Sequence, residues 1–201
     1  AMEVTPFLGR SGRLDLTSGL DSKVRLLSGV VRSTSGRRSF DVAGEAGGLR
    51  VPVGVYVLES ATLGRGTDRV RVRPGRSRTF TVAADDVTRV EWGSPVRAEF
   101  RYHRSGDRVA FHPDDVRYFG AAGEEYVDFR PFGASPEFVV KEDGSGEEIE
   151  HAVFGGSCSE GFHPVAVRVP ERRAIAVELR ASTWAFGEVL GLASPPEDEI
   201  E

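Results

Sequence analysis

The stretch VPVGVYVLESATL, residues 51–63, carries the clearest strand pattern in the chain. Four valines at every second position from Val51 to Val57 would share one face of an extended strand, and Tyr56 and Leu58 would share the other. Because both faces are then partly apolar, the pattern predicts a strand in the middle of a sheet rather than at its edge.

Shorter alternating segments surround this stretch, and turn residues separate them. The GRGTD sequence at 64–68 and the Asp143-Gly144 pair are typical hairpin turns. Glycine (24) and proline (11) are frequent and there is a single methionine, so long helices are not expected. Turns about 8 to 12 residues apart are typical of sandwiches. The sequence therefore predicts an all-β protein of two tandem antiparallel β-sandwich domains.

The domain boundary is expected at the turn formed by residues 93–95, which divides two stretches of similar length. This gives an N-terminal sandwich at 1–94 and a C-terminal sandwich at 95–193. The tail at 194–201 is acidic, has little apolar surface and is predicted to be disordered.

Composition narrows the classes of protein that fit. No apolar run approaches the roughly 20 residues of a membrane-spanning helix, so no transmembrane segment is expected. The single cysteine excludes an internal disulfide. The formal net charge is −5 and the sequence pI is about 5.5, which argues against a dedicated nucleic-acid binder. The first half of the chain is net basic and the second half net acidic.

The string VPVGVYVL, residues 51–58, is similar to the LPxGxYxL strand of prealbumin-like and carboxypeptidase-regulatory-like sandwich modules of bacterial surface proteins. Val53 stands where that family more often has Ala or Pro. The resemblance covers about eight residues. It implies an Ig-like or prealbumin-like sandwich that serves as a spacer, a stabiliser or a binding platform outside the cytoplasm.

Three ligand-capable side chains, His151, Cys158 and His163, lie close together in the sequence. Thiolate and imidazole both bind Zn²⁺ or copper, so the three residues are a candidate metal site. The same residues could form a Cys-His nucleophilic pair, although no family signature flanks Cys158. The alternative is a cysteine in a glycine-rich hairpin loop with two surface histidines.

Arg69, Arg71 and Arg73 occupy alternate positions of one expected strand and would form a stripe able to bind a polyanion. The competing interpretation, which we favour, is an edge strand whose charges prevent aggregation.

Three further patterns have a simple structural interpretation. The HPDD sequence at 112–115, with His103 nearby, could bind a metal, but it is also a good turn. The acidic segment 141–150 lacks the oxygen ligands of a calcium loop and is expected to be a hairpin. Tryptophan and tyrosine side chains could bind sugar if exposed, but we expect them to fill the core: Trp92, Tyr102, Tyr118, Tyr126 and Trp184.

The sequence thus predicts a non-catalytic, extracytoplasmic or cell-envelope module that recognises a protein or a polysaccharide, or that spaces such a component. A cytoplasmic location stays open. No enzyme activity and no cofactor are expected. The alternative is a small metal-binding or hydrolytic protein that uses His151, Cys158 and His163 with Zn or Cu. Nucleic acid is not an expected partner.

Overall fold

The chain is almost entirely β-stranded. Its structure, a computed structural model, describes residues 9–20, 23–36, 38–44, 47–130, 135–157, 161–180 and 189–193. Within these residues there is one short 3₁₀-helix, η1 (Pro113–Asp115), and no α-helix, which confirms an all-β protein. The strands are β1 Ser11–Asp15, β2 Arg25–Ser33, β3 Ser39–Asp41, β4 Leu49–Pro52, β5 Gly54–Arg65, β6 Asp68–Arg73, β7 Phe80–Val82, β8 Val87–Arg89, β9 Val96–Phe100, β10 His103–Ser105, β11 Arg108–Phe111, β12 Arg117–Phe119, β13 Glu125–Arg130, β14 Glu137–Glu142, β15 Glu148–Val153, β16 Gly155–Ser157, β17 Gly161–His163, β18 Val165–Arg168, β19 Ile175–Arg180 and β20 Val189–Ala193.

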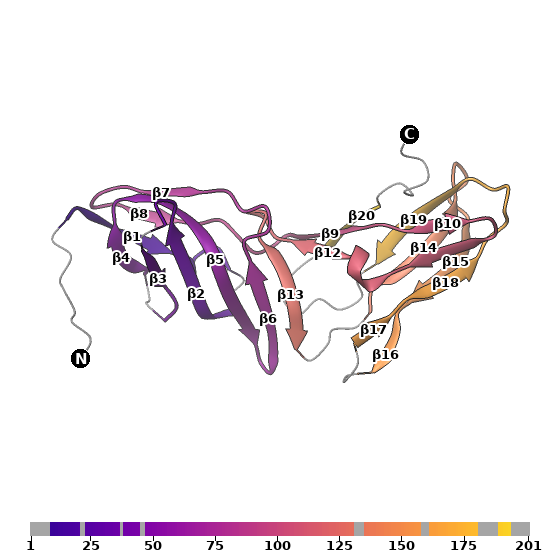
Figure 1. Cartoon of the computed structure of the whole chain (residues 1–201), viewed down its shortest axis with the longest axis horizontal. Helices are drawn as coiled ribbons and strands as arrows, with labels where there is room; N and C mark the ends of the chain where they lie inside the picture. Colours follow the sequence, from indigo (N-terminus) through magenta and orange to yellow (C-terminus); the bar gives the residue numbers. More distant parts are fainter. Residues whose placement is uncertain are drawn as a thin grey trace.

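The strands form five sheets. The strands of the N-terminal part of the chain lie toward one end of the long axis of the molecule, and β10, β11, β14, β15, β18 and β19 lie toward the other (Figure 1). The largest has nine strands in the order β20-β9-β12-β13-β6-β5-β2-β3, with β7 paired to β5. Three smaller sheets have the orders β4-β1-β8, β10-β11-β18 and β15-β14-β19, and β16 pairs with β17. Most pairs are antiparallel. The β1–β8 and β9–β20 pairs are parallel, which the expectation of antiparallel sandwiches did not include.

The stretch at residues 51–63 forms two strands in two different sheets. Val51 lies on β4 and is buried, whereas β5 begins at Gly54 and leaves Val55 38% exposed. The prediction that the alternate valines share one face is therefore wrong, because the backbone bends at Val53. The prediction of a central strand is confirmed for β5, which lies between β2 and β6.

The first cluster of buried side chains fills the N-terminal half. Tyr56 on β5 contacts the rings of Phe40 and Phe80, and its hydroxyl donates a hydrogen bond of 2.7 Å to Pro52 O. The indole N–H of Trp92 donates a buried hydrogen bond of 2.7 Å to Leu16 O. These two bonds satisfy the polar atoms that the aromatic side chains carry into the core.

The second cluster fills the C-terminal half and is rich in phenylalanine. Phe138 on β14 stacks on Phe111 with ring centroids 4.3 Å apart, and it meets the edges of Phe100 and Phe154. The expectation that aromatic side chains belong to the core is confirmed for Trp92, Tyr102 and Tyr126, which are all buried. Trp184 and the tail at 194–201 lie outside the described residues.

Strands β9, β12 and β13 join the two halves (Figure 1). On β9, Val96 belongs to the first cluster and Phe100 to the second, and Tyr118 on β12 packs against both. β13 pairs with β6, so strands from either side of Gly93 share the nine-stranded sheet. The division into domains at residues 94 and 95 stays a prediction.

Candidate functional site

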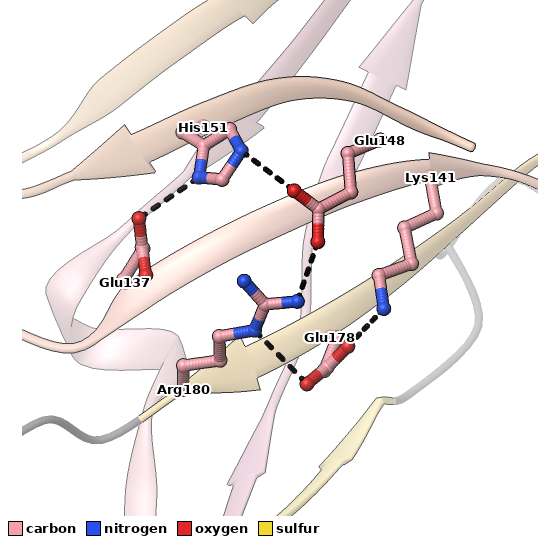
Figure 2. Close-up of polar contacts among 6 residues, drawn as sticks. All are labelled: Glu137, Lys141, Glu148, His151, Glu178 and Arg180. Carbon is pink, nitrogen blue, oxygen red and sulfur yellow. Dashed lines mark hydrogen bonds and ion pairs between the residues drawn. The ribbon is translucent and has the colours of Figure 1, made fainter. Parts of the chain in front are cut away.

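Six charged side chains form an unbroken chain of contacts on one face of the β15-β14-β19 sheet (Figure 2). Each strand contributes two of them. On β14 and β19 the two members are separated by an even number of positions and so point to the same face, whereas on β15 the register shift opposite Val140 and Lys141 brings Glu148 to the same face as His151. In order, the chain runs Glu137, His151, Glu148, Arg180, Glu178 and Lys141.

His151 lies between two carboxylates in this network. Its Nδ1 is 2.8 Å from Glu137 Oε1 and its Nε2 is 3.2 Å from Glu148 Oε2. The hydrogen bond with Glu137 raises the pKa of His151, and the charges of Glu137 and Glu148 add to this effect. When His151 is protonated, the three cations balance the three carboxylates.

The other members of the network form close ion pairs. Arg180 donates to Glu148 over 2.6 Å and to Glu178 over 3.1 Å, and Lys141 donates to Glu178. The bond from Arg180 lowers the pKa of Glu148, and the bond from Lys141, followed by that from Arg180, lowers the pKa of Glu178. These acids are therefore charged at neutral pH.

An apolar residue lies beneath the network. Val139 is completely buried, although it points away from Phe138 and Val140, its neighbours in the second core cluster. Its partners in the ladder are His151 and Glu178. The alkyl stems of the charged side chains thus cover the valine while their heads remain in water.

The three predicted metal ligands have different positions. His151 is engaged by Glu137 and Glu148, and His163 is exposed at the end of β17, where its backbone pairs with Gly155. Cys158 lies outside the described residues. No group of three His, Cys, Asp or Glu side chains suited to a metal ion occurs in the part of the chain that the structure describes. The site of His151, Cys158 and His163 stays a prediction.

The HPDD sequence is the turn that its proline and aspartates predicted. Pro113–Asp115 form η1, and His112 Nδ1 accepts a hydrogen bond of 3.3 Å from the backbone N–H of Asp114. His103 Nε2 is 3.3 Å from Asp115 Oδ2.

The arginine stripe of β6 faces acids on the neighbouring strand. Arg73 forms two hydrogen bonds of 2.8 and 2.7 Å with Glu125, and Arg71 forms one of 2.8 Å with Asp128. Arg69 donates to the backbone carbonyls of residues 66 and 68. β6 pairs with β5 on one side and β13 on the other, so the interpretation as an edge strand is wrong.

The basic surface continues beyond β6 across three more strands. Directly paired residues share a face, and the pairing aligns Arg73, Glu125, Phe119 and Arg97 in one row from β6 to β9. Arg117 on β12 lies opposite Glu99 on β9, in the adjacent row. We call this surface the arginine face and define it by five residues: Arg71, Arg73, Arg76, Arg97 and Arg117.

Arg76 and Phe119 lie at the centre of the arginine face. The Arg76 guanidinium is 4.2 Å above the Phe119 ring and forms two hydrogen bonds of 2.7 and 2.8 Å with Glu99. Arg97 and Arg117 are exposed, and no carboxylate of the described residues forms an ion pair with either. The alternation in VRAEF, residues 96–100, indicated that Arg97 points outward, but not which strands lie beside it.

A buried carboxylate, that of Glu124, connects backbone segments at the junction between the two halves. Glu124 is fully buried; it accepts hydrogen bonds from Gly93 N (2.7 Å), Ala122 N (3.0 Å) and the Tyr126 hydroxyl (3.3 Å). Burial raises its pKa, and the three donors act in the opposite direction. The residue links the connector before β9 to the turn between β12 and β13.

The fold and these surfaces define the chain as an all-β protein with ion-paired sheet faces. No protein-family model, curated protein or solved structure matches it. The described residues include no helix long and apolar enough to cross a membrane.

Proposed function

We propose that the chain is a non-catalytic binding or structural module, located outside the cytoplasm, that recognises a polysaccharide or a protein. One observation carries this proposal: in the part of the chain that the structure describes, two of the histidines, the side chains most often used for acid–base catalysis, are engaged with carboxylates at the protein surface. His151 contacts Glu137 and Glu148, and His103 contacts Asp115, with the imidazoles close to half exposed. Such pairs stabilise a surface, whereas an acid–base catalyst needs a proton donor or acceptor turned toward a substrate.

The fold supports the same proposal. Tandem β-sandwich domains, Ig-like or prealbumin-like, would place binding surfaces at fixed separations, and the two buried clusters agree with two such units. The shared sheet at β9, β12 and β13 would keep the units in register.

Affinity electrophoresis of the full chain tests the proposal. Gels contain neutral polymers (dextran, starch) or anionic polymers (polygalacturonate, heparin), and polymer length is measured after incubation with the protein. We expect retardation by at least one polymer, with no change in its length. Shortening of the polymer would contradict a non-catalytic role, and migration unchanged in every gel would leave only recognition of a protein. Immunodetection in fractionated cells of the source organism tests the location.

The alternative is a metal-binding or hydrolytic protein that uses His151, Cys158 and His163. Metal analysis of protein purified without a histidine tag distinguishes the two proposals. Stoichiometric Zn or Cu that disappears in Cys158→Ser would favour the alternative.

A further inference from the structure

We infer that the arginine face is a binding surface for an anionic polysaccharide, with repeating carboxylate or sulfate groups as its targets. This inference deepens the proposed function and rests on it, because it assigns the ligand class and the surface. It extends the sequence-based stripe of β6 onto β12 and β9.

Charge is the first reason. The face has five arginines and three acids: Asp128, Glu125 and Glu99. Arg97 and Arg117 add positive charge that no acid of the described residues pairs with. The surface thus carries a positive excess although the formal net charge of the chain is −5. A local excess of this kind attracts anions and steers them to the surface.

Unused donors are the second reason. A guanidinium has five N–H groups. Arg71 uses one nitrogen for Asp128, while Arg73 and Arg76 each use two for their carboxylates. Their side chains are 68%, 55% and 62% exposed, so the remaining N–H groups reach solvent. The acids thus hold the guanidinium planes in place without occupying all their donors, which reduces the entropy lost when an anion binds.

Dimensions are the third reason. Neighbouring strands are about 4.8 Å apart, so the three steps from β6 to β9 cover about 14 Å. The row of charges therefore crosses the junction between the two halves and is long enough to meet several charged groups of one extended polymer. A single small anion would use only part of it.

The face lacks what single-stranded nucleic acid requires. Binding of bases depends on exposed aromatic rings for stacking. The ring of Phe119 on this face is only 6% exposed and lies under Arg76. The described residues of the face therefore offer charge and hydrogen bonds but no stacking platform, which favours a polysaccharide.

Two matched double variants of the full chain test the inference. R97S/R117S removes the two arginines without ion pairs. R13S/R50S is the control, because Arg13 and Arg50 are exposed partners on the separate β1–β4 pair and it makes the same change in net charge. Both should keep the melting temperature of the parent protein. Isothermal titration at about 0.15 M salt uses polygalacturonate, whose charged groups are all carboxylates, and heparin, which carries sulfates as well as carboxylates, so binding to heparin alone would indicate a requirement for sulfate.

We expect R97S/R117S to weaken binding to at least one of the two polymers by about 10-fold or more, and the control to change it by less than about 2-fold. E99Q removes a negative charge from the face, while its amide oxygen can still accept a hydrogen bond from Arg76, so this variant should bind more tightly. Equal losses in both double variants would overturn the inference, because binding would then depend on net charge alone. Absence of binding to both polymers, or tighter binding to duplex DNA, would also overturn it. If affinity electrophoresis showed retardation by dextran or starch but by neither anionic polymer, the arginine face would not be the binding surface. The proposed function as a polysaccharide-binding module would still hold.

Discussion

Replacement of Glu124 is the sharpest test of the junction between the two halves. Glu124→Ala leaves three donors without their acceptor: the backbone N–H groups of Gly93 and Ala122 and the hydroxyl of Tyr126. An unsatisfied buried donor costs about 1–3 kcal/mol. The hydroxyl can rotate toward another acceptor, but the two amides are fixed by the backbone. Since the variant also removes the cost of burying a carboxylate, we expect a net loss of about 3 kcal/mol in the free energy of unfolding.

Glu124→Gln separates charge from shape. The amide oxygen can accept from one of the two backbone N–H groups, but its NH₂ then faces the other, so two donors meet. We expect a loss of about 2 kcal/mol at neutral pH. Because burial raises the pKa of Glu124, its contribution to stability is fully present below the ordinary pKa of glutamate and is lost as pH rises through the folded-state pKa. The difference between parent and variant should therefore be larger at acidic pH.

Urea unfolding monitored by tryptophan fluorescence measures both variants, since Trp92 is buried next to Gly93. Glu150→Gln is the control, because Glu150 is an exposed glutamate on β15 and should change stability by less than about 0.5 kcal/mol. A loss in Glu124→Ala no larger than that of the control would refute the reasoning. So would a loss in Glu124→Gln that does not vary with pH.

Three other single substitutions have predictable effects on the stability of the fold. Gly120→Ala should cost about 3 kcal/mol or prevent folding, since a Cβ there would overlap the Glu124 carboxylate, whereas Gly155→Ala has open space and should be near neutral in the same urea titration. Phe138→Ala should cost about 3–5 kcal/mol in calorimetry because it removes the ring at the centre of the second cluster; a loss below about 1 kcal/mol would contradict that position. His151→Gln should remove stability that is fully present below the ordinary pKa of histidine and that fades as pH rises through its raised folded-state pKa, so melting temperatures of parent and variant should converge at alkaline pH.

The positions of most strands could be predicted from the sequence, but the pairing between strands that are distant in the sequence could not. Alternation in residues 54–58 and 96–100 follows directly from burial of every second side chain, and turn residues marked the hairpins at Gly66 and Gly144. The bend at Val53 was not predicted, although Pro52 offered a signal for it, because proline has no backbone N–H to donate within a sheet and belongs at strand ends, sheet edges or bulges.

The candidate surfaces depended on contacts between distant segments. Arg73 and Glu125 lie on strands from different halves of the sequence, and only their pairing reveals that the arginine forms an ion pair. Arg97 and Arg117 became part of the same face for the same reason. His151 was identifiable as a polar surface residue, but its two carboxylate neighbours follow from the register of β14 against β15.

The pairing of β6 with β13 has a consequence for synthesis of the chain. β6 ends at Arg73, and the strand that covers it begins at Glu125, so the ribosome must add about fifty residues before this pairing can form. During that interval β6 is the open border of a growing sheet. We expect the positive charges of Arg69, Arg71 and Arg73 to repel a second nascent chain that presents the same border, until the acids of β13 have been synthesised. The same guanidinium groups would thus limit association between incomplete chains during synthesis and form part of the arginine face once the protein has folded.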